Sequence, residues 1–211
     1  MQKSKKILFL SISLLFLISA LLIDVKPLTV KAATHDVTLT TSVQSYLVFD
    51  ITVGDTIALG DLTPGTPICS STTTASVTTN AANGYTLGLH DGVASTGSAL
   101  LHTDTTTRIT DMTNGTIASP VVWGTNTGLG VNLWDADTAK STSQWGAGTT
   151  VCDALNEYAA VPTTATTAHT VTGFHSGADT SDWSWKIDVP NTQKTGAYSG
   201  VVTFTATPVL S

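Results

Sequence analysis

Positive charge is scarce in this sequence. Lysine and arginine make up nine of the 211 residues, and five of the nine lie within the first 32 residues. A protein that binds nucleic acid needs a basic patch to neutralise phosphates. The sequence therefore argues against nucleic acid as a partner. The four basic residues that remain are scattered along the chain: Arg108, Lys140, Lys186 and Lys194.

Motifs of catalysis are also lacking. The chain has a single glutamate, Glu157, and it contains no HExxH, no GxSxG and no Gly-rich phosphate-binding motif. His90 and His102 lie near Asp91 and Asp104 in the sequence, but without the spacing of a metal-ligand set. We therefore expect a protein that is not an enzyme and that has no catalytic residues and no metal site at these histidines.

One acidic segment, "WDADTAKSTSQW", places Asp135 and Asp137 two residues apart, shortly after Asn132. Side-chain oxygens at such spacing can bind Ca²⁺. The glycine and glutamate of an EF-hand loop are missing, so the sequence favours a solvated acidic loop. We predict no cofactor, with calcium as the alternative.

The start of the chain has the three zones of a secretory signal. Basic residues in "MQKSKK" precede an apolar run from Ile7 to Ile23, and "VKA" ends at Ala32. We predict that residues 1–32 are a signal-peptide helix and that the protein is exported to the cell surface or the extracellular space. An uncleaved membrane anchor is the alternative, because the apolar run is near the lower length limit of a spanning helix.

Cysteine is rare. In an exported chain, the pair Cys69 and Cys152 most simply forms one disulfide. A metal site or a reactive thiol is disfavoured, because there is no CxxC spacing and no nearby histidine cluster. The bond would close a long loop and stabilise the fold by roughly 4 kcal/mol in the chain-entropy model.

Alternation of apolar and polar residues runs through most of the remaining chain. It is clear in "YLVFDITV", "TASVTT", "YTLGL", "WSWKIDV" and "AYSGVVTFTATPV", and turn sequences such as Pro64-Gly65 separate these runs. Period-two patterns are typical of half-buried strands. We predict an all-β fold, an antiparallel β-sandwich of Ig-like or Greek-key type, as a single domain over residues 33–211.

The stretch "NAANGYTLGL" joins a turn to a strand. Asn83 and Gly84 both tolerate positive φ, which predicts a hairpin turn. Tyr85, Leu87 and Leu89 then share one strand face, which favours core packing for the tyrosine ring. Its hydroxyl must reach water or a polar partner.

Residues 91–150 differ from the rest. They are rich in Gly, Thr, Ser and Asn, and their apolar residues show no sustained period. We predict a long, loop-rich insertion between core strands. Three of its side chains, Trp123, Trp134 and Trp145, are candidate ligand-binding aromatics, because sugar rings stack on exposed aromatic faces. Core packing is the alternative for them, and it is the prediction for Trp183 and Trp185, which share a strand face with Ile187.

Three segments in fixed order resemble the WxL-type domains of Gram-positive surface proteins: "ALGDLTPGTPICSSTTTASVTTNAANGYTLGL", "SDWSWKIDVP" and "TGAYSGVVTFTATP". More loosely, they resemble secreted β-sandwich proteins of the spore-coat-U and pilin-like kind. Gly84, Tyr85 and Leu87 stand where the first WxL motif has its strand. Tyr198 and Phe204 stand where the second has its own, and Tyr85 and Phe204 replace the signature tryptophans.

The resemblance implies extracellular, non-enzymatic attachment to cell-wall polymer or to other surface proteins. Our expectation is a secreted bacterial cell-surface protein that acts in envelope attachment or surface structure, with membrane contact only through an uncleaved signal. Two alternatives remain: a pilin-like subunit that polymerises by strand addition, and a carbohydrate-binding module.

Overall fold

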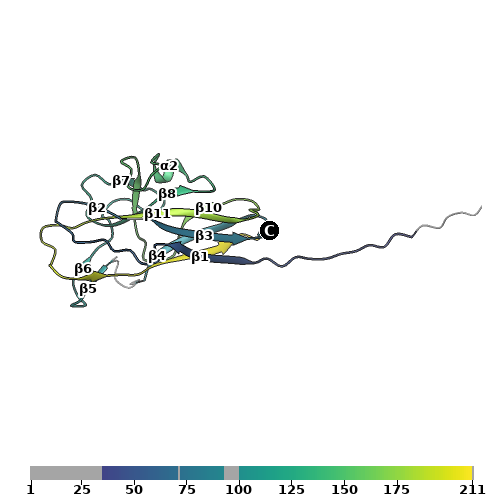
Figure 1. Ribbon diagram of the computed structural model, residues 1–211, viewed down its shortest axis with the longest axis horizontal. Helices are drawn as coiled ribbons and strands as arrows, with labels where there is room; N and C mark the ends of the chain where they lie inside the picture. The colour runs from purple at the N-terminus through teal and green to yellow at the C-terminus, as the bar shows by residue number, and fades with distance from the viewer. Residues whose placement is uncertain (1–34, 71, 93–99, 211) are drawn as a thin grey trace, which may run out of the picture. The chain divides into compact units, whose positions relative to one another are not determined.

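The computed structural model describes residues 35–70, 72–92 and 100–210 (Figure 1). The predicted signal peptide, residues 1–32, lies outside these ranges. The chain divides into two compact units, Met1–Ser42 and Val43–Ser211. In the first unit, residues 35–42 are exposed and belong to no helix or strand. Within the described ranges, no helix is both long and apolar enough to cross a membrane.

The regular elements of the second unit are strands joined by loops, with one four-residue helix among the elements described. This bears out the expectation of an all-β chain. The elements are β1 (Leu47–Val53), β2 (Ile68–Cys69), β3 (Thr73–Thr79), β4 (Tyr85–Asp91), β5 (Leu100–His102), β6 (Arg108–Ile109), β7 (Val121–Val122), β8 (Gly128–Ala136), α2 (Thr142–Trp145), β9 (Glu157–Ala160), β10 (Thr166–Val171), β11 (Ala178–Asp188), β12 (Tyr198–Ser199) and β13 (Val202–Pro208).

These strands form three antiparallel sheets. The largest has the order β1-β3-β11-β8-β9-β7, with β2 also paired to β11. The second has the order β10-β4-β13, and the third, much shorter, has the order β12-β5-β6. Neighbouring strands in every sheet run antiparallel.

The period-two pattern in the sequence matches the burial of the strands. Along β4, the predicted inward side chains Tyr85, Leu87 and Leu89 are at most 1% exposed. Along β3, Ala75 and Val77 are equally buried. A strand places alternate side chains on opposite faces, so one alternating run supplies one face of the core.

One core receives side chains from both large sheets. Trp183 and Ile187 of β11 are fully buried in the same cluster as the inward residues of β4, and Trp185 is nearly so. The Trp183 ring meets Trp145 edge-on, with 5.7 Å between ring centroids, and Phe204 of β13 at 5.4 Å. The predicted core roles of Trp183 and Trp185 are thus confirmed.

The turn before β4 differs from the prediction. It connects β3 of the largest sheet to β4 of the second sheet, and β3 and β4 do not pair with each other, so it is not a hairpin turn. Gly84 has a φ of 82°, and a Cβ atom at this position would overlap the carbonyl oxygen of Val171. Glycine is therefore required here both by conformation and by space.

Residues 91–150 also differ from the expected insertion. Residues Gly128–Ala136 form β8, which lies between β11 and β9 inside the largest sheet. Its inward residues Leu129, Val131 and Leu133 are buried in the core. The loop-rich character holds for the segments around β8, but a core strand runs through the stretch.

The structure contains the predicted disulfide. Cys69, at the end of β2, is bonded to Cys152, in the loop before β9, and the Cα atoms are 5.9 Å apart. The two residues are separated by 83 positions in the sequence. The bond therefore ties a strand that pairs with the centre of the largest sheet to the segment that follows α2.

Candidate functional site

The two large sheets leave one side incompletely covered. β1 ends the largest sheet and β13 ends the second sheet, and these two strands lie next to each other (Figure 1). Their inward side chains pack on the core but remain half-buried, unlike those of β3, β4 and β11. We call this row the seam. It consists of Leu47, Phe49 and Ile51 of β1 and Val202, Phe204 and Ala206 of β13.

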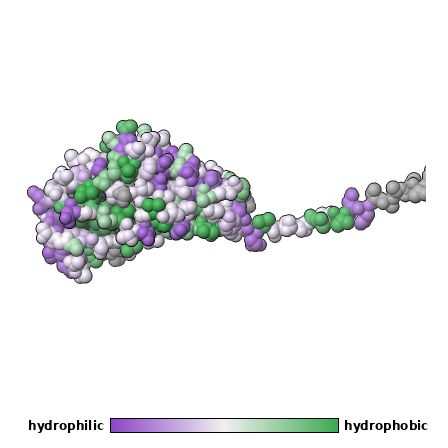
Figure 2. Space-filling model, in the orientation of Figure 1, coloured by the Kyte–Doolittle hydropathy of each residue, from purple (hydrophilic) through white to green (hydrophobic). Residues whose placement is uncertain are grey.

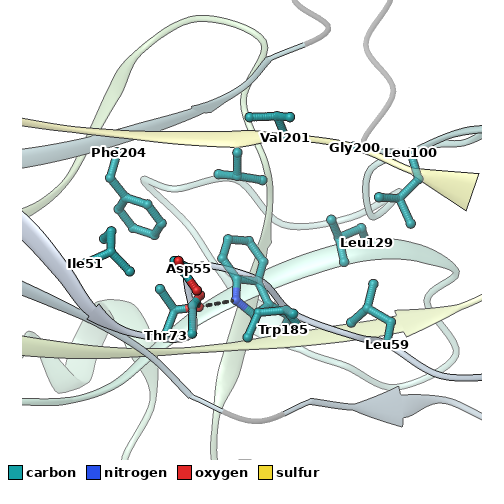
Figure 3. A pocket seen from close by; sticks show the side chains of 13 residues that line it. Ile51, Asp55, Leu59, Thr73, Leu100, Leu129, Trp185, Gly200, Val201 and Phe204 are labelled. Atoms are coloured by element: carbon teal, nitrogen blue, oxygen red, sulfur yellow. Dashed lines mark hydrogen bonds between the residues drawn. The ribbon is translucent and has the colours of Figure 1, made fainter.

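A hollow of about 220 Å³ opens at one end of the seam. Figure 3 shows the Trp185 ring in its middle, with Phe204 and Ile51 on one side and Leu129 on the other. The indole N–H donates to the Thr73 hydroxyl at 3.0 Å, so the polar atom of this ring is already satisfied. Most of the other lining side chains are apolar, with Asp55 as the charged one, so the hollow offers mainly apolar surface, which suits an apolar side chain.

The free edge of β13 presents unpaired backbone groups. The N–H of Val209 donates to the carbonyl of Gly84, and the N–H of Gly92 donates to the carbonyl of Val201. The backbone N–H and C=O groups of the odd-numbered residues therefore point toward β4. Since backbone groups alternate in direction along a strand, those of Val202, Phe204 and Ala206 point to the free edge. The same residues supply the β13 half of the seam.

The other sheet edges carry features that discourage pairing. The ladder of β1 is interrupted between Ile51 and Val53, and Asp50 lies on its exposed face. The ladder of β10 is interrupted between Thr167 and His169, and β7 has only two residues. Bulges, charges and short length are the usual protections of sheet edges.

In contrast, β13 has seven residues in unbroken register with β4 and no charged side chain. Its outward positions are all threonine, and proline occurs only at Pro208, its last residue. Among the sheet edges described, this one is the least protected against strand addition.

Several buried polar groups serve the fold. Asp179 is 1% exposed, accepts a hydrogen bond from the Thr138 hydroxyl at 2.8 Å and is hydrogen-bonded to Tyr85. Burial and this carboxylate both raise the pKa of the Tyr85 hydroxyl. The polar partner that the tyrosine requires is thus Asp179 of β11, which links the second sheet to the largest one.

A second polar cluster lies beside the short third sheet. Asp104 accepts hydrogen bonds from the Lys194 ammonium at 2.8 Å and from the backbone N–H groups of Thr106 and Thr107. These donors, Lys194 first, lower the pKa of the carboxyl group. His102 lies 3.1 Å from Asp104 and packs against Tyr198. The cluster holds two loops together through groups that are already partnered.

The residues considered for calcium are not brought together. Asn132 is buried, and its amide donates to the backbone carbonyls of Trp145 and Glu157. Asp135 and Asp137 are exposed, and Asp137 accepts hydrogen bonds from Thr180. Across the described parts of the chain, no group of three or more His, Cys, Asp or Glu side chains is placed to hold a metal ion.

The three candidate tryptophans have different environments. Trp145 is fully buried and Trp123 is 4% exposed, so neither offers a free face for a sugar ring. Trp123 packs edge-on against Tyr158, and the Lys186 ammonium lies 5.5 Å from its ring centroid. Trp134 is half-buried. The carbohydrate-binding alternative therefore rests on Trp134.

The motif residues of the WxL resemblance fall on paired strands. β4, which begins at Tyr85, pairs with β13 along its whole length, and Phe204 lies opposite Leu89. Gly84 and Leu87 belong to the turn and core already described. Tyr198 lies apart on β12, where its hydroxyl donates to the carbonyl of Lys194 at 2.8 Å.

The fold and the seam together define a class: an all-β protein of antiparallel sheets, cross-linked by one disulfide and left open along one pair of edge strands. Comparison with known proteins adds no family. No protein-family model matches the chain, and no curated protein matches it.

The seam is the feature that sequence reasoning missed. Its side chains follow the same alternation as the interior ones, and nothing in the alternation itself marks β13 as an edge strand. One signal was available in the segment before β1, where Val37, Leu39 and Val43 alternate with polar residues. A further strand pattern that pairs with no strand in the described part of the chain indicates an unfilled pairing site.

Proposed function

We propose that this protein is a secreted, non-enzymatic β-sandwich of a bacterial cell surface, acting in envelope attachment or surface structure. The sandwich of Ig-like or Greek-key type is supported by the single core to which both large sheets contribute. Export is supported by the disulfide, which persists in oxidising compartments, and by the signal pattern at the start of the sequence. The pairing of β4 with β13 supports the WxL-like arrangement.

The observation that carries the functional part is the seam. A monomer that functioned alone would gain stability by covering Phe204 and the hollow around Trp185, yet these apolar groups stay half-open beside an unprotected edge strand. Exposed apolar surface rimmed by polar residues is typical of interaction sites. Figure 2 shows hydrophobic side chains, in green, gathered in patches among white and purple, more hydrophilic ones on this face. The protein then acts by binding a partner and not by catalysing a reaction.

A retention assay tests the attachment role. The purified chain is incubated with isolated bacterial envelope, either intact or stripped of its proteins by protease. Retention on both preparations indicates a cell-wall polymer as partner, and retention on the intact envelope alone indicates a surface protein. Phe204→Ser should weaken retention, whereas Thr203→Ser, on the outer face of the same strand, should leave it unchanged. Absence of retention on both preparations would overturn the attachment role.

A pilin-like subunit is the second candidate function, and the free edge of β13 favours it. Polymerisation by strand addition needs an acceptor edge and a donor strand. The acceptor is the edge that lacks the usual protections.

A further inference from the structure

The segment before β1 has the sequence pattern of a strand, but it pairs with no strand among the residues that the structure describes. Val37 is 76% exposed, Leu39 is 89% exposed and Val43 is 84% exposed. They alternate with polar residues in "VTLTTSV", so an extended backbone places all three on one face. None of residues 35–43 belongs to a strand in the structure.

We propose that residues 37–43 of one copy, the donor strand, pair with the free edge of β13 of a second copy, the acceptor edge. In this arrangement Val37, Leu39 and Val43 cover the seam. The inference rests on the strand-addition role named above and gives that role its donor and its acceptor.

The lengths and charges of residues 37–43 and of β13 are compatible with pairing between them. The donor and β13 each span seven residues, so the two strands can pair along their whole length. Neither residues 37–43 nor β13 contains an ionisable side chain, so pairing removes no charge from water. The first charged residue before the donor is Asp36, which would lie beyond the end of the pairing. If cleavage occurs after Ala32, the donor lies close to the start of the mature chain.

The anchoring of residues 44–46 favours a second copy over the chain's own seam. The Tyr46 N–H donates to the Asn80 side chain at 2.8 Å, and the Asn80 amide donates to the Gln44 carbonyl at 2.9 Å. Asn80 follows β3, so these bonds extend the β1–β3 pairing beyond Leu47. To pair with the free edge of its own β13 over all seven residues, the segment would need its turn at residues 44–46, where both bonds are made.

The backbone directions explain how β13 accepts the strand without losing its own pairing. The free N–H groups belong to Val202, Phe204 and Ala206, while the odd-numbered positions stay bonded to β4. Ala206→Pro removes one free N–H and leaves the β4 ladder intact. Ala206→Val is the matched control, because it keeps the N–H and has a β-branched side chain suited to strands.

The test measures the mass of the oxidised, purified protein by light scattering over a range of concentrations. The wild type should form assemblies whose mass rises with concentration. The double variant Val37→Asp/Leu39→Asp and the variant Ala206→Pro should each be monomeric. The control Thr38→Asp/Thr40→Asp, with the same charges on the opposite face, and the control Ala206→Val should assemble like the wild type.

Mixing the two monomeric variants provides the decisive step. The Ala206→Pro copy keeps its donor and the Val37→Asp/Leu39→Asp copy keeps its acceptor, so the mixture should form a complex of two chains and no larger species. If the mixture stays monomeric, or if either monomeric variant assembles like the wild type, the proposal is overturned.

Hydrogen exchange provides a readout that needs no change in β13. The backbone amides that point to the free edge, those of Val202, Phe204 and Ala206, should become protected as wild-type concentration rises, but not in Val37→Asp/Leu39→Asp. Protection in a wild type that stays monomeric would mean that the segment folds onto its own chain, and would overturn pairing between copies. Absence of any protection would overturn β13 as the acceptor.

The experiments distinguish a failure of the strand-exchange proposal from a failure of the attachment proposal. Monomeric variants that are still retained on envelope, together with a wild type that does not assemble, would overturn strand exchange alone. Assembly without retention on any envelope preparation would overturn the attachment role alone.

Discussion

The interior of the fold and the seam use the same kinds of side chain and cover them to different extents. Trp183 in the interior is fully buried, whereas Phe204, whose ring centroid lies 5.4 Å from that of Trp183, is half-buried. The difference follows from sheet order, because β11 has strands on both sides and β13 has one only on the β4 side. The apolar side chains are thus fully covered in the interior and only partly covered along the seam.

The largest expected effect separates these two regions directly. Trp183→Ala removes a fully buried ring and should lower the free energy of unfolding by up to about 5 kcal/mol. Phe204→Ala removes a half-buried ring and should cost the monomer about 1–2 kcal/mol, because part of that surface is already in water. Urea unfolding of both variants provides the measurement. Equal losses would mean that the seam is packed as firmly as the interior.

The disulfide should come next in size. It joins β2 to the segment before β9, neither of which is a seam strand, and it closes a loop with a sequence separation of 83. Cys69→Ser/Cys152→Ser should lower the free energy of unfolding by about 4 kcal/mol in the chain-entropy model. Urea unfolding of this variant and of the wild type gives the difference, with the oxidised and reduced wild type as a second comparison. If the folded variant loses assembly, the seam and the disulfide are coupled, contrary to our expectation.

Replacing the glycine in the turn between the two large sheets should lower the free energy of unfolding more than replacing a glycine in an open turn. Gly84→Ala combines a φ of 82° with overlap on Val171, and should cost at least about 2 kcal/mol. Gly60 has a φ of 76° and open space around the Cβ position, so Gly60→Ala should cost only the conformational part, about 1 kcal/mol. Thermal unfolding of the pair measures the difference, which equal melting temperatures would contradict.

The smallest effect concerns a half-buried carboxyl group. Burial, and secondly the charge of Asp91, raise the pKa of Asp111 from 3.8 to about 7. The folded state then keeps a proton that the unfolded state has lost, so Asp111 lowers the free energy of unfolding as pH rises from about 4 to about 7. Asp111→Asn should remove this decrease, as measured by urea unfolding across that range.

The Asp111 comparison needs the wild type beside the variant at each pH. Burial lowers the pKa of His169 from 6.5, so this side chain raises stability as pH rises through part of the same range. Asp104, whose pKa is lowered, changes stability only below about pH 4. The prediction is therefore that the free energy of unfolding changes with pH at a different slope in the wild type and in Asp111→Asn. Identical slopes would contradict it.

Alternation in the sequence was enough to predict strands with one apolar face. It identified Tyr85, Leu87 and Leu89 on β4 and the tryptophans of β11, because each of these runs has a polar side that makes the pattern visible. It indicated "LGVNLW" of β8 only as a short strand or loop anchor and not as a core strand, because Gly130 and Asn132 occupy the second face and are buried as well. A strand covered on both faces has no polar side from which to read a period.

Pairing partners could not be predicted in the same way. "NAANG" has the residues of a hairpin turn, but turn residues determine the local backbone and not which sheet the next strand joins. For the same reason β1 and β13 could be predicted as strands and not as edges. The disulfide was predictable because two cysteines in an exported chain allow only one intramolecular pairing.

The separation of donor and acceptor has a consequence for symmetry. The donor precedes the first strand and the acceptor is the last strand, so a contact between them joins two different surfaces. Such a heterologous contact leaves one donor and one acceptor free at the ends of every assembly, and it grows into an open fibre unless the rotation between copies closes a ring. An assembly of this protein would therefore be polar, with two chemically distinct ends, and each end could be capped by a different molecule.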